Sequence, residues 1–213
     1  MSRIVVHGPG LSSYVWSARI ALAEKGVAYE HDDMAFGTHK LPEHLARHPF
    51  GKVPALEHDG FALYETQAIL RYVDEAFPGP ALQPSDPKRR ARMNQVMGVL
   101  DAYGWPSCAG GIMFNRLIAP KYGLPSSEAA VEAAIPTARL CYAEWERMLG
   151  DQPFMTGDSF TLADVLLAPL VIFSPFTAET RAMLAEAPRL TAWGERMRAR
   201  PAVAATSPLA PAA

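Results

Sequence analysis

The stretch that decides the fold is His48-Pro49-Phe50-Gly51-Lys52-Val53-Pro54-Ala55-Leu56, and it is followed by Tyr64-Glu65-Thr66-Gln67-Ala68-Ile69. In it, a Val-Pro pair stands just before a short apolar strand, and a Glu-Thr pair stands where the next strand meets a helix. This arrangement offers the backbone of a strand and the N-terminus of a helix to one small, peptide-like ligand. It narrows the function more than any other feature of the sequence.

The residues around this stretch predict a small α/β domain over residues 1–77. In chain order, the predicted elements are a strand at 4–7, a helix from Ser12 or Ser13 to about Gly26, a strand at 29–33, a short helix at 42–48, strands at 55–58 and 61–64, and a helix at 65–76. Asp59-Gly60 lies between the last two strands, and Asp-Gly between two such runs is typical of a β-hairpin. The order β-α-β, then β-β-α, resembles thioredoxin.

Prolines separate this domain from a second one. Residues 78–86 form a proline-rich linker, and residues 87–213 are predicted to be all helical. One helix is expected to bury Met93, Val96, Met97, Leu100 and Tyr103 on a single face. Another covers 127–149, with a kink at Pro136. Thr161-Leu162-Ala163-Asp164 has the pattern of a capping box, and the Ala/Pro-rich tail from Ala202 is expected to be frayed.

Composition excludes several classes of function. The net charge is −2, from 20 basic and 22 acidic residues, so we expect neither nucleic acid nor a membrane surface as a partner. The densest basic run, residues 88–92, is interpreted as a solvated helix face in preference to a phosphate site. The two cysteines, Cys108 and Cys141, have no metal-ligand spacing, and no apolar stretch is long enough to cross a bilayer. The chain is therefore expected to be cytoplasmic and to use no metal.

Val53-Pro54 is the first candidate binding element. An X-Pro bond in a tight turn can be cis, which would leave the Val53 N–H and C=O free to pair with a peptide-like ligand as an extra strand. The alternative is a trans proline that starts a strand, which is the commoner case for the dipeptide alone.

Glu65-Thr66 is the second candidate. A helix N-terminus attracts a carboxylate through its free N–H groups and its dipole. Thr66 adds a hydroxyl donor, and Glu65 can accept from an ammonium group, so the pair suits the amino-acid end of a ligand. A plain helix cap explains the same residues equally well.

Two further groups precede these elements. A hydroxyl of Ser12 or Ser13, at the start of the first helix, can donate to a thiolate, and the helix N-terminus lowers the pKa of a nearby thiol. N-capping is the alternative role for either serine. His39-Lys40 could hold a second carboxylate, or both could be solvated loop residues.

Together and in this order, the motifs resemble those of cytosolic glutathione S-transferases, nearest the phi and theta classes and their bacterial relatives. The motifs that carry the resemblance are Ser12-Ser13-Tyr14-Val15, Arg19-Ile20-Ala21-Leu22-Ala23-Glu24-Lys25-Gly26, Gly37-Thr38-His39-Lys40, His48-Pro49-Phe50-Gly51-Lys52-Val53-Pro54, Tyr64-Glu65-Thr66 and Ser159-Phe160-Thr161-Leu162-Ala163-Asp164. The resemblance spans nearly the whole chain.

The resemblance implies the glutathione transferase fold, an α/β N-terminal thioredoxin-like domain plus an all-α C-terminal helical domain. It implies that the Ser12 hydroxyl stabilises glutathione thiolate, with Ser13 as the alternative in a shifted register. The residues that it implies for glutathione binding are His39, Lys40, Lys52, Val53, Pro54, Glu65 and Thr66. Thr161 and Asp164 match the family's buried capping box, whose role is in folding.

The reaction that the resemblance implies is conjugation of glutathione, as co-substrate, to a small hydrophobic electrophile, in a homodimer. Candidates for contact with the electrophile are Tyr14, Tyr103, Trp105 and Phe114, with helical core as their alternative role. Since no cysteine precedes Cys108, thiol-transfer chemistry is not expected. The alternatives are a non-catalytic glutathione-binding or regulatory protein of the same fold, or a glutathione-dependent isomerase or peroxidase. A zeta-type isomerase would have cysteine where Tyr14 stands.

Overall fold

The computed structural model describes residues 2–209, which divide into two compact units. The first unit contains the residues up to Gln83 together with those from Ala199 onward, and the second contains Pro84–Arg198. Each unit has its own buried apolar core.

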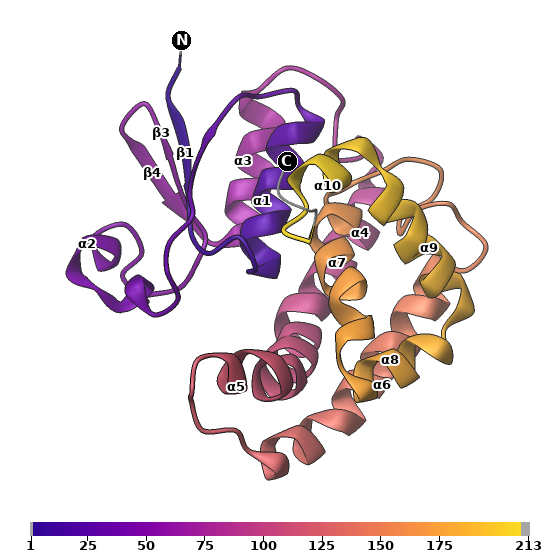
Figure 1. Ribbon diagram of the computed structural model, residues 1–213. Coiled ribbons are helices and arrows are strands. Elements are labelled where there is room, and N and C mark those ends of the chain that lie inside the picture. Colours follow the sequence, from indigo (N-terminus) through magenta and orange to yellow (C-terminus); the bar gives the residue numbers. More distant parts are fainter. Residues whose placement is uncertain (1, 210–213) are drawn as a thin grey trace. The chain divides into compact units, whose positions relative to one another are not determined.

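The first unit is built on a four-stranded sheet in the order β2-β1-β3-β4 (Figure 1). Its strands are β1 (Ile4–His7), β2 (Glu30–Asp32), β3 (Ala55–His58) and β4 (Phe61–Tyr64). β1 pairs parallel to β2 and antiparallel to β3, and β3 pairs antiparallel to β4. Two helices, α1 (Ser13–Glu24) and α3 (Thr66–Ala76), pack together in this unit. This is the thioredoxin-like α/β arrangement that the sequence predicts.

The core of the first unit explains why these segments fold as they do. β1 is buried along its whole length, as expected for an inner strand, and Val6 pairs with Leu56 in the register of the sheet. Trp16 on α1 and Ile69 on α3 are also almost completely buried. At the β3–β4 turn, Asp59 and Gly60 both have positive φ angles, 48° and 87°. Those angles suit a two-residue hairpin turn, so the Asp-Gly prediction is confirmed.

The segment before β3 is less regular than predicted. A short 3₁₀ helix, η1 (Thr38–Lys40), precedes α2 (Pro42–Leu45), which is shorter than the predicted helix over 42–48. The chain still turns tightly beyond α2, since the backbone N–H of His48 donates to the His44 carbonyl at 2.8 Å. Pro49 disfavours the helical conformation of the residue before it, which explains why the helix does not continue.

The C-terminal tail differs from the prediction. Rather than fraying from Ala202, it forms a helix, α10 (Pro201–Thr206), that packs against α1 within the first unit. The indole Nε1 of Trp16 donates to the Thr206 hydroxyl at 3.0 Å, and Arg200 forms a two-point ion pair with Glu24 at 2.5 and 2.8 Å. These contacts order the tail and place it with the first unit instead of the helical one. Residues 210–213 lie outside the described residues.

A buried ion pair holds the segment that ends the first unit. Lys25 Nζ lies 3.1 Å from Asp74 Oδ1 and also donates to the Pro80 carbonyl, and both side chains are at most 7% exposed. Asp74 accepts in addition from the Leu82 backbone N–H and from Gln83. The proline-rich segment is therefore fixed to the first unit as far as Gln83.

The second unit is all helical, as predicted. Its helices are α4 (Pro87–Val99), the π-type segment η2 (Leu100–Ile118), α5 (Ala119–Lys121), α6 (Glu128–Leu149), α7 (Leu162–Phe173), the 3₁₀ turn η3 (Ser174–Phe176), α8 (Ala178–Ala185) and α9 (Pro188–Ala199). α7 is buried at almost every position and forms the centre of this unit, with α4 and η2 packed against it.

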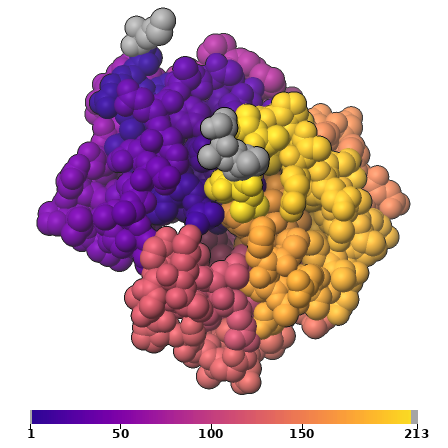
Figure 2. Space-filling model, viewed as in Figure 1, coloured from indigo at the N-terminus to yellow at the C-terminus, as the bar shows by residue number. Residues whose placement is uncertain are grey.

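The wide winding of η2 was not predicted from the sequence. A π-helix bonds residue i to i+5, so its buried positions recur at longer intervals than those of an α-helix. Leu100, Gly104, Cys108 and Ile112 are buried, at intervals of four residues. Tyr103 is off this buried face and is 57% exposed, so its assignment to the core face is wrong. The surface of η2 and α5 is visible in Figure 2 (rose).

Two glycines let η2 approach α6 closely. A Cβ atom at Gly104 would lie 2.6 Å from the Trp145 ring, and one at Gly111 would lie 2.4 Å from Ala134 Cβ. Both distances are too short for a side chain to be added without movement. The glycines, which weaken an α-helix, are therefore used here for packing.

The predicted capping box at the start of α7 is confirmed. The buried Asp164 carboxylate accepts from the Thr161 N–H at 2.9 Å and from the Thr161 hydroxyl at 3.1 Å. Its other oxygen accepts from the Met155 N–H at 2.8 Å and from Trp193 Nε1 at 3.1 Å. One carboxylate thus joins the helix start, the preceding loop and α9.

No single helix within residues 2–209 combines the length and apolar composition needed to span a membrane. The segments Leu162–Phe176 and Ala178–Ala185 reach that composition only when taken together, and they meet at a bend of 113°.

Candidate functional site

Ser12 ends the turn between β1 and α1. It is the N-cap of α1, and its Oγ accepts from the Val15 backbone N–H at 3.4 Å. The Oγ accepts in this bond, so the hydroxyl proton is left to donate, and no described residue accepts it. Ser13 is the first residue of the helix. A half-buried hydroxyl that caps a helix can therefore also face a ligand at that helix N-terminus.

The Val53–Pro54 peptide bond is cis, as the resemblance implies. Pro54 is buried and Val53 is half-buried. Among the described residues, neither the N–H nor the C=O of Val53 has a hydrogen-bond partner. An unpaired donor and acceptor on one residue can receive an extended peptide as a further strand.

Gly8 brings Val53 close to the turn that carries Ser12. A Cβ atom at Gly8 would lie 3.0 Å from Val53 Cβ and 2.5 Å from Val15 Cγ2. Its φ of 144° also favours glycine. The β1–α1 turn and the residue before the cis-proline can pack this closely only because Gly8 has no side chain.

Glu65 and Thr66 lie at the start of α3, but Glu65 is not a side-chain cap. It stands just before the helix with φ 72° and ψ 114°, an uncommon conformation for a residue with a side chain, and its carboxylate makes no capping bond. Glu65 is exposed, whereas Thr66 is buried as the first residue of the helix. Strained backbone of this kind is concentrated at functional sites.

The basic residues predicted to meet a second carboxylate lie together beside this segment. His39 is half-buried, and its pKa is lowered by burial first and then by the charges of Lys40, His44 and Lys52. A Cβ atom at Gly51 would lie 3.1 Å from the His39 carbonyl oxygen and 3.2 Å from Lys40 Cδ. The turn of η1 and the segment before Val53 are thus in contact, with both lysines exposed.

His44 was not predicted from the sequence to belong to the site. The residue is 1% exposed, and Nε2 donates to the Lys52 carbonyl at 2.7 Å, while Nδ1 has no partner among the described residues. The buried His48, whose pKa burial lowers, packs on the Tyr64 ring at 4.8 Å between centroids. The spacing of four between the two histidines in a predicted helix was the signal that could have found this pair.

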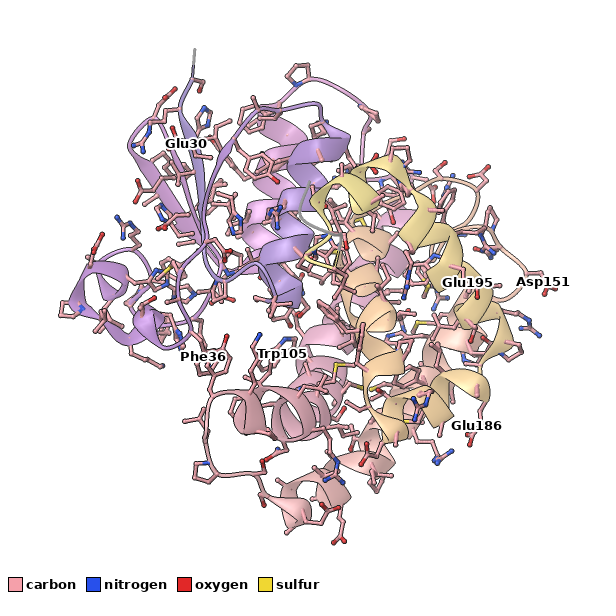
Figure 3. The ribbon with its side chains drawn as sticks, viewed as in Figure 1. Glu30, Phe36, Trp105, Asp151, Glu186 and Glu195 are labelled. Atoms are coloured by element: carbon pink, nitrogen blue, oxygen red, sulfur yellow. The ribbon has the colours of Figure 1, made fainter. Side chains whose placement is uncertain are left out.

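The aromatic candidates for electrophile contact belong to both units. Tyr14 is half-buried on α1 in the first unit. In the second unit Trp105 (Figure 3) and Phe114 are half-buried on η2, whereas Tyr103 on the same segment is exposed. None of the four belongs to a fully buried core, which was the alternative role for each.

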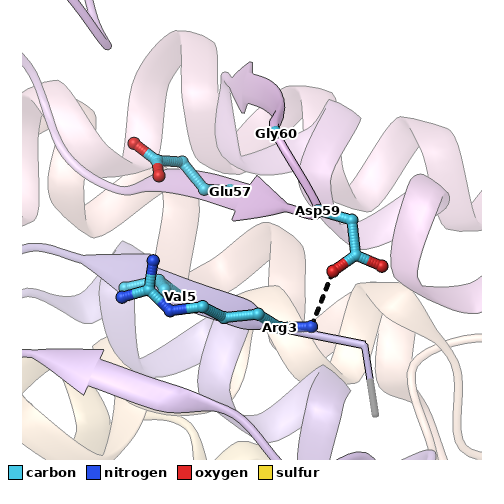
Figure 4. Close-up of a pocket in the computed structure, with 5 residues that line it drawn as sticks. All are labelled: Arg3, Val5, Glu57, Asp59 and Gly60. Atoms are coloured by element: carbon cyan, nitrogen blue, oxygen red, sulfur yellow. Dashed lines mark hydrogen bonds between the residues drawn. The ribbon is translucent and has the colours of Figure 1, made fainter.

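A small hollow of about 40 Å³ lies on the sheet of the first unit (Figure 4). Its lining residues are Arg3, Val5, Glu57, Asp59 and Gly60. It lies near the end of β1 where Ile4 pairs with His58, whereas Ala55, which follows the Val-Pro pair, is opposite His7 at the other end. The hollow is therefore separate from the candidate site. Among residues 2–209, no three His, Cys, Asp or Glu side chains are grouped to hold a metal ion.

Comparison with known proteins shows the family of this chain. Residues 4–75 match the glutathione S-transferase N-terminal domain, and residues 128–196 match the glutathione S-transferase C-terminal domain. Glutathione S-transferase 4 of Zea mays is 34% identical over 202 residues, which cover 93% of this chain and 89% of that protein. Glutathione S-transferase F14 of Arabidopsis thaliana is 33% identical, over 89% of this chain and 78% of that protein.

Solved structures agree with the sequence relatives. Glutathione transferase F7 from Populus trichocarpa has a TM-score of 0.85 at 26% identity, covering 95% of this chain and 97% of that chain. The theta class glutathione S-transferase from Xanthomonas axonopodis pv. citri, solved with glutathione bound, has a TM-score of 0.81 at 28% identity, covering 99% of both chains. The fold and the motifs thus define a glutathione-dependent transferase. This chain belongs to the glutathione S-transferase family.

Proposed function

We propose that this protein binds glutathione in its first unit and activates the thiol for attack on a small hydrophobic electrophile. The observation that carries the proposal is the unpaired backbone of Val53 beside a cis-proline, held by Gly8 next to the Ser12 turn. Val53 would pair with the cysteinyl backbone of glutathione and thereby direct its sulfur towards the N-terminus of α1.

The two ends of glutathione have matching partners on either side. Glu65 and Thr66 would hold the γ-glutamyl end, since a carboxylate and a helix N-terminus suit an ammonium and a carboxylate group. His39, Lys40 and Lys52 would meet the glycyl carboxylate. Burial and the neighbouring positive charges lower the pKa of His39, so it would take part as a neutral hydrogen-bond donor.

The nucleophile would be the thiolate of glutathione itself. The Ser12 hydroxyl donates to the sulfur, and the partial positive charge at the start of α1 favours its ionised form. The cysteines of the chain are poor candidates for thiol chemistry, because burial raises the pKa of Cys108 to about 12 and that of Cys141 to about 11. Trp105 and Phe114 would contribute apolar surface for the electrophile, with Tyr14 and Tyr103 as further contacts.

We assign the protein to the phi/theta-like group and propose a cytoplasmic homodimer with a role in detoxification. Plant glutathione S-transferases and a bacterial theta class enzyme among the similar proteins support this group. Sedimentation equilibrium at micromolar protein concentration tests the dimer, which a monomer mass would exclude.

The function is tested by calorimetric titration with glutathione and by turnover of 1-chloro-2,4-dinitrobenzene, an aryl halide. We expect one glutathione site per chain and conjugate formation near neutral pH. Glutathione binding without conjugation of any electrophile would favour a non-catalytic binding protein of the same fold. If glutathione does not bind at all, the proposal is wrong. Turnover of a maleyl-type diene acid but not of the aryl halide would favour an isomerase.

His44 gives a test of how the Val53 segment is positioned. His44→Leu removes the donor to the Lys52 carbonyl and so loosens the peptide that precedes Val53. We expect KM for glutathione to rise by roughly tenfold, with kcat at saturating glutathione changed far less, because the loss of one buried hydrogen bond costs about 1–2 kcal/mol.

His44→Gln is the matched control for this prediction, because its amide N–H can donate to the same carbonyl. It should restore most of the affinity for glutathione. If both variants have the wild-type KM, or if kcat falls with KM unchanged, His44 does not position the segment. Melting temperatures of both variants separate this effect from general unfolding.

A further inference from the structure

The second unit contains a basic hollow that the proposed glutathione site does not use. It has a volume of about 420 Å³, which is within the range of small-molecule sites. Four of its lining residues are cationic and none is acidic. The lining residues are Lys88, Arg89, Arg92, Arg147, Met148, Gln152, Met155 and Thr156. We name this feature the α4–α6 basic hollow.

Two of the cations are held in place by carboxylates at the rim. Arg147 forms a two-point ion pair with Glu144 at 2.6 and 2.7 Å. Arg89 donates to Asp158 at 2.8 Å and to the Thr156 carbonyl at 3.2 Å. Such pairs fix each guanidinium on one side and leave its remaining N–H groups available, since a guanidinium carries five donors.

The other two cations have no ion-pair partner within hydrogen-bonding distance among the described residues. Arg92 donates only to the neutral Gln95 amide oxygen, at 2.6 Å, and no described residue pairs with Lys88. The four cations and the two rim carboxylates, Glu144 and Asp158, leave a net charge of two positive. The carboxylate of Asp151 points outward from the turn after α6 (Figure 3) and pairs with Arg189 outside the hollow.

Hydrogen bonds connect the loop that lines the hollow to the neighbouring helices. The Met155 N–H is bonded to the buried Asp164 carboxylate, which ties the 155–156 loop to the start of α7. Gly157, with φ 122°, lets Arg89 pack against this loop, since a Cβ atom there would lie 3.3 Å from its guanidinium nitrogen. The four cations thus stand on two helices, α4 and α6, beside a loop that hydrogen bonds hold in place.

From this arrangement we propose that the α4–α6 basic hollow binds a phosphate dianion carried by a small molecule. A phosphate ester has a charge of about −2 at neutral pH, which matches the net charge of the cluster. Its oxygens accept from guanidinium groups in the geometry that arginine presents. These four cations line a concave site on a chain of net charge −2, which favours a small ligand over a nucleic acid or a membrane surface.

The test is calorimetric titration of the full chain with magnesium-free pyrophosphate and with inorganic phosphate. We expect one saturable site per chain that persists at about 0.15 M salt, where exposed charges are screened beyond about 8 Å. Binding should be unchanged in saturating glutathione, because no residue assigned to glutathione lines the hollow. The double variant Lys88→Gln/Arg92→Gln should bind pyrophosphate at least about tenfold more weakly.

Arg90→Gln is the matched control, since Arg90 lies on the same helix but does not line the hollow. Both variants should keep the wild-type melting temperature and conjugating activity. The proposal is overturned if the loss of Arg90 weakens pyrophosphate binding as much as the loss of each cation in the double variant. It is also overturned if binding disappears at about 0.15 M salt. Either result would mean that the chain attracts anions in general, without a specific site. Binding to anionic vesicles or RNA without binding to pyrophosphate would also overturn it.

Discussion

Ser12→Ala is expected to lower kcat/KM for conjugation of an aryl halide by about 10²- to 10³-fold near neutral pH, the usual cost of removing one hydrogen-bond donor from a developing or resident anion. The physical reason is that Ser12 lies at the N-terminus of α1, where no described residue accepts a hydrogen bond from its hydroxyl. The pH profile should also move. Because the hydroxyl stabilises the thiolate, its removal raises the pKa of bound glutathione towards the value of a free thiol, about 8.5.

The matched control is Ser13→Ala, which removes the same hydroxyl one residue later. Ser12→Ala also removes a helix cap, at a cost of about 1 kcal/mol, so rates are measured well below the melting temperature of each variant. Ser12→Thr keeps both the cap and the donor and should retain most of the activity. Full activity of Ser12→Ala together with a large loss of activity in Ser13→Ala would show that the Ser13 hydroxyl, and not that of Ser12, donates to the thiolate.

Asp164→Ala is expected to have the largest effect on folding. The carboxylate accepts four hydrogen bonds in a buried place, from the Met155 N–H, the Thr161 N–H and hydroxyl, and the Trp193 indole. Removing it leaves all four donors without an acceptor and should lower the free energy of unfolding by at least about 3–5 kcal/mol. That is a large fraction of the stability of most domains, so we expect the yield of soluble protein at 37 °C to fall sharply.

Two other variants keep this prediction measurable. Trp193→Phe removes one of the four donors and should cost about 1 kcal/mol in urea unfolding. Asp158→Ala, in the loop that precedes α7 and with its side chain 83% exposed, should change stability by less than about 1 kcal/mol. An Asp164→Ala protein as stable as Asp158→Ala would show that the four bonds do not support the fold.

The same carboxylate gives a pH dependence. Burial raises the pKa of Asp164 to about 6, against the lowering effect of its hydrogen bonds. The folded state then binds the proton more tightly than the unfolded state does, so the contribution to stability is complete below the unfolded pKa of about 4 and is lost as pH rises to about 6. We therefore expect the free energy of unfolding in urea of the wild type, minus that of Asp164→Asn, to decrease between about pH 4 and pH 6. If this difference in free energy increases over the same range, the pKa of Asp164 is lowered by folding and the prediction is wrong.

Local patterns in the sequence were sufficient wherever neighbouring residues determine the structure. Asp59-Gly60 adopts the positive φ angles of a hairpin turn, and Thr161 with Asp164 forms a capping box, because each depends on atoms a few residues apart. The apolar run of β1 likewise predicts its burial. The order of these elements, together with the Val53-Pro54 and Glu65-Thr66 motifs, is enough to indicate the fold and the family.

Contacts between distant residues decided the rest. Trp16 and Glu24 order the C-terminal helix through Thr206 and Arg200, and nothing in an Ala/Pro-rich tail indicates those partners. Gly104 and Gly111 meet α6 only in the folded chain, and the wide winding of η2 was not visible in a helical pattern that predicted Tyr103 to be buried. His44 reaches the Lys52 carbonyl, and the basic run 88–92 meets Arg147 of α6, only in the folded chain. Sequence determines which backbone conformations are locally favourable, whereas side-chain partners are selected by packing, which brings together residues far apart in the chain.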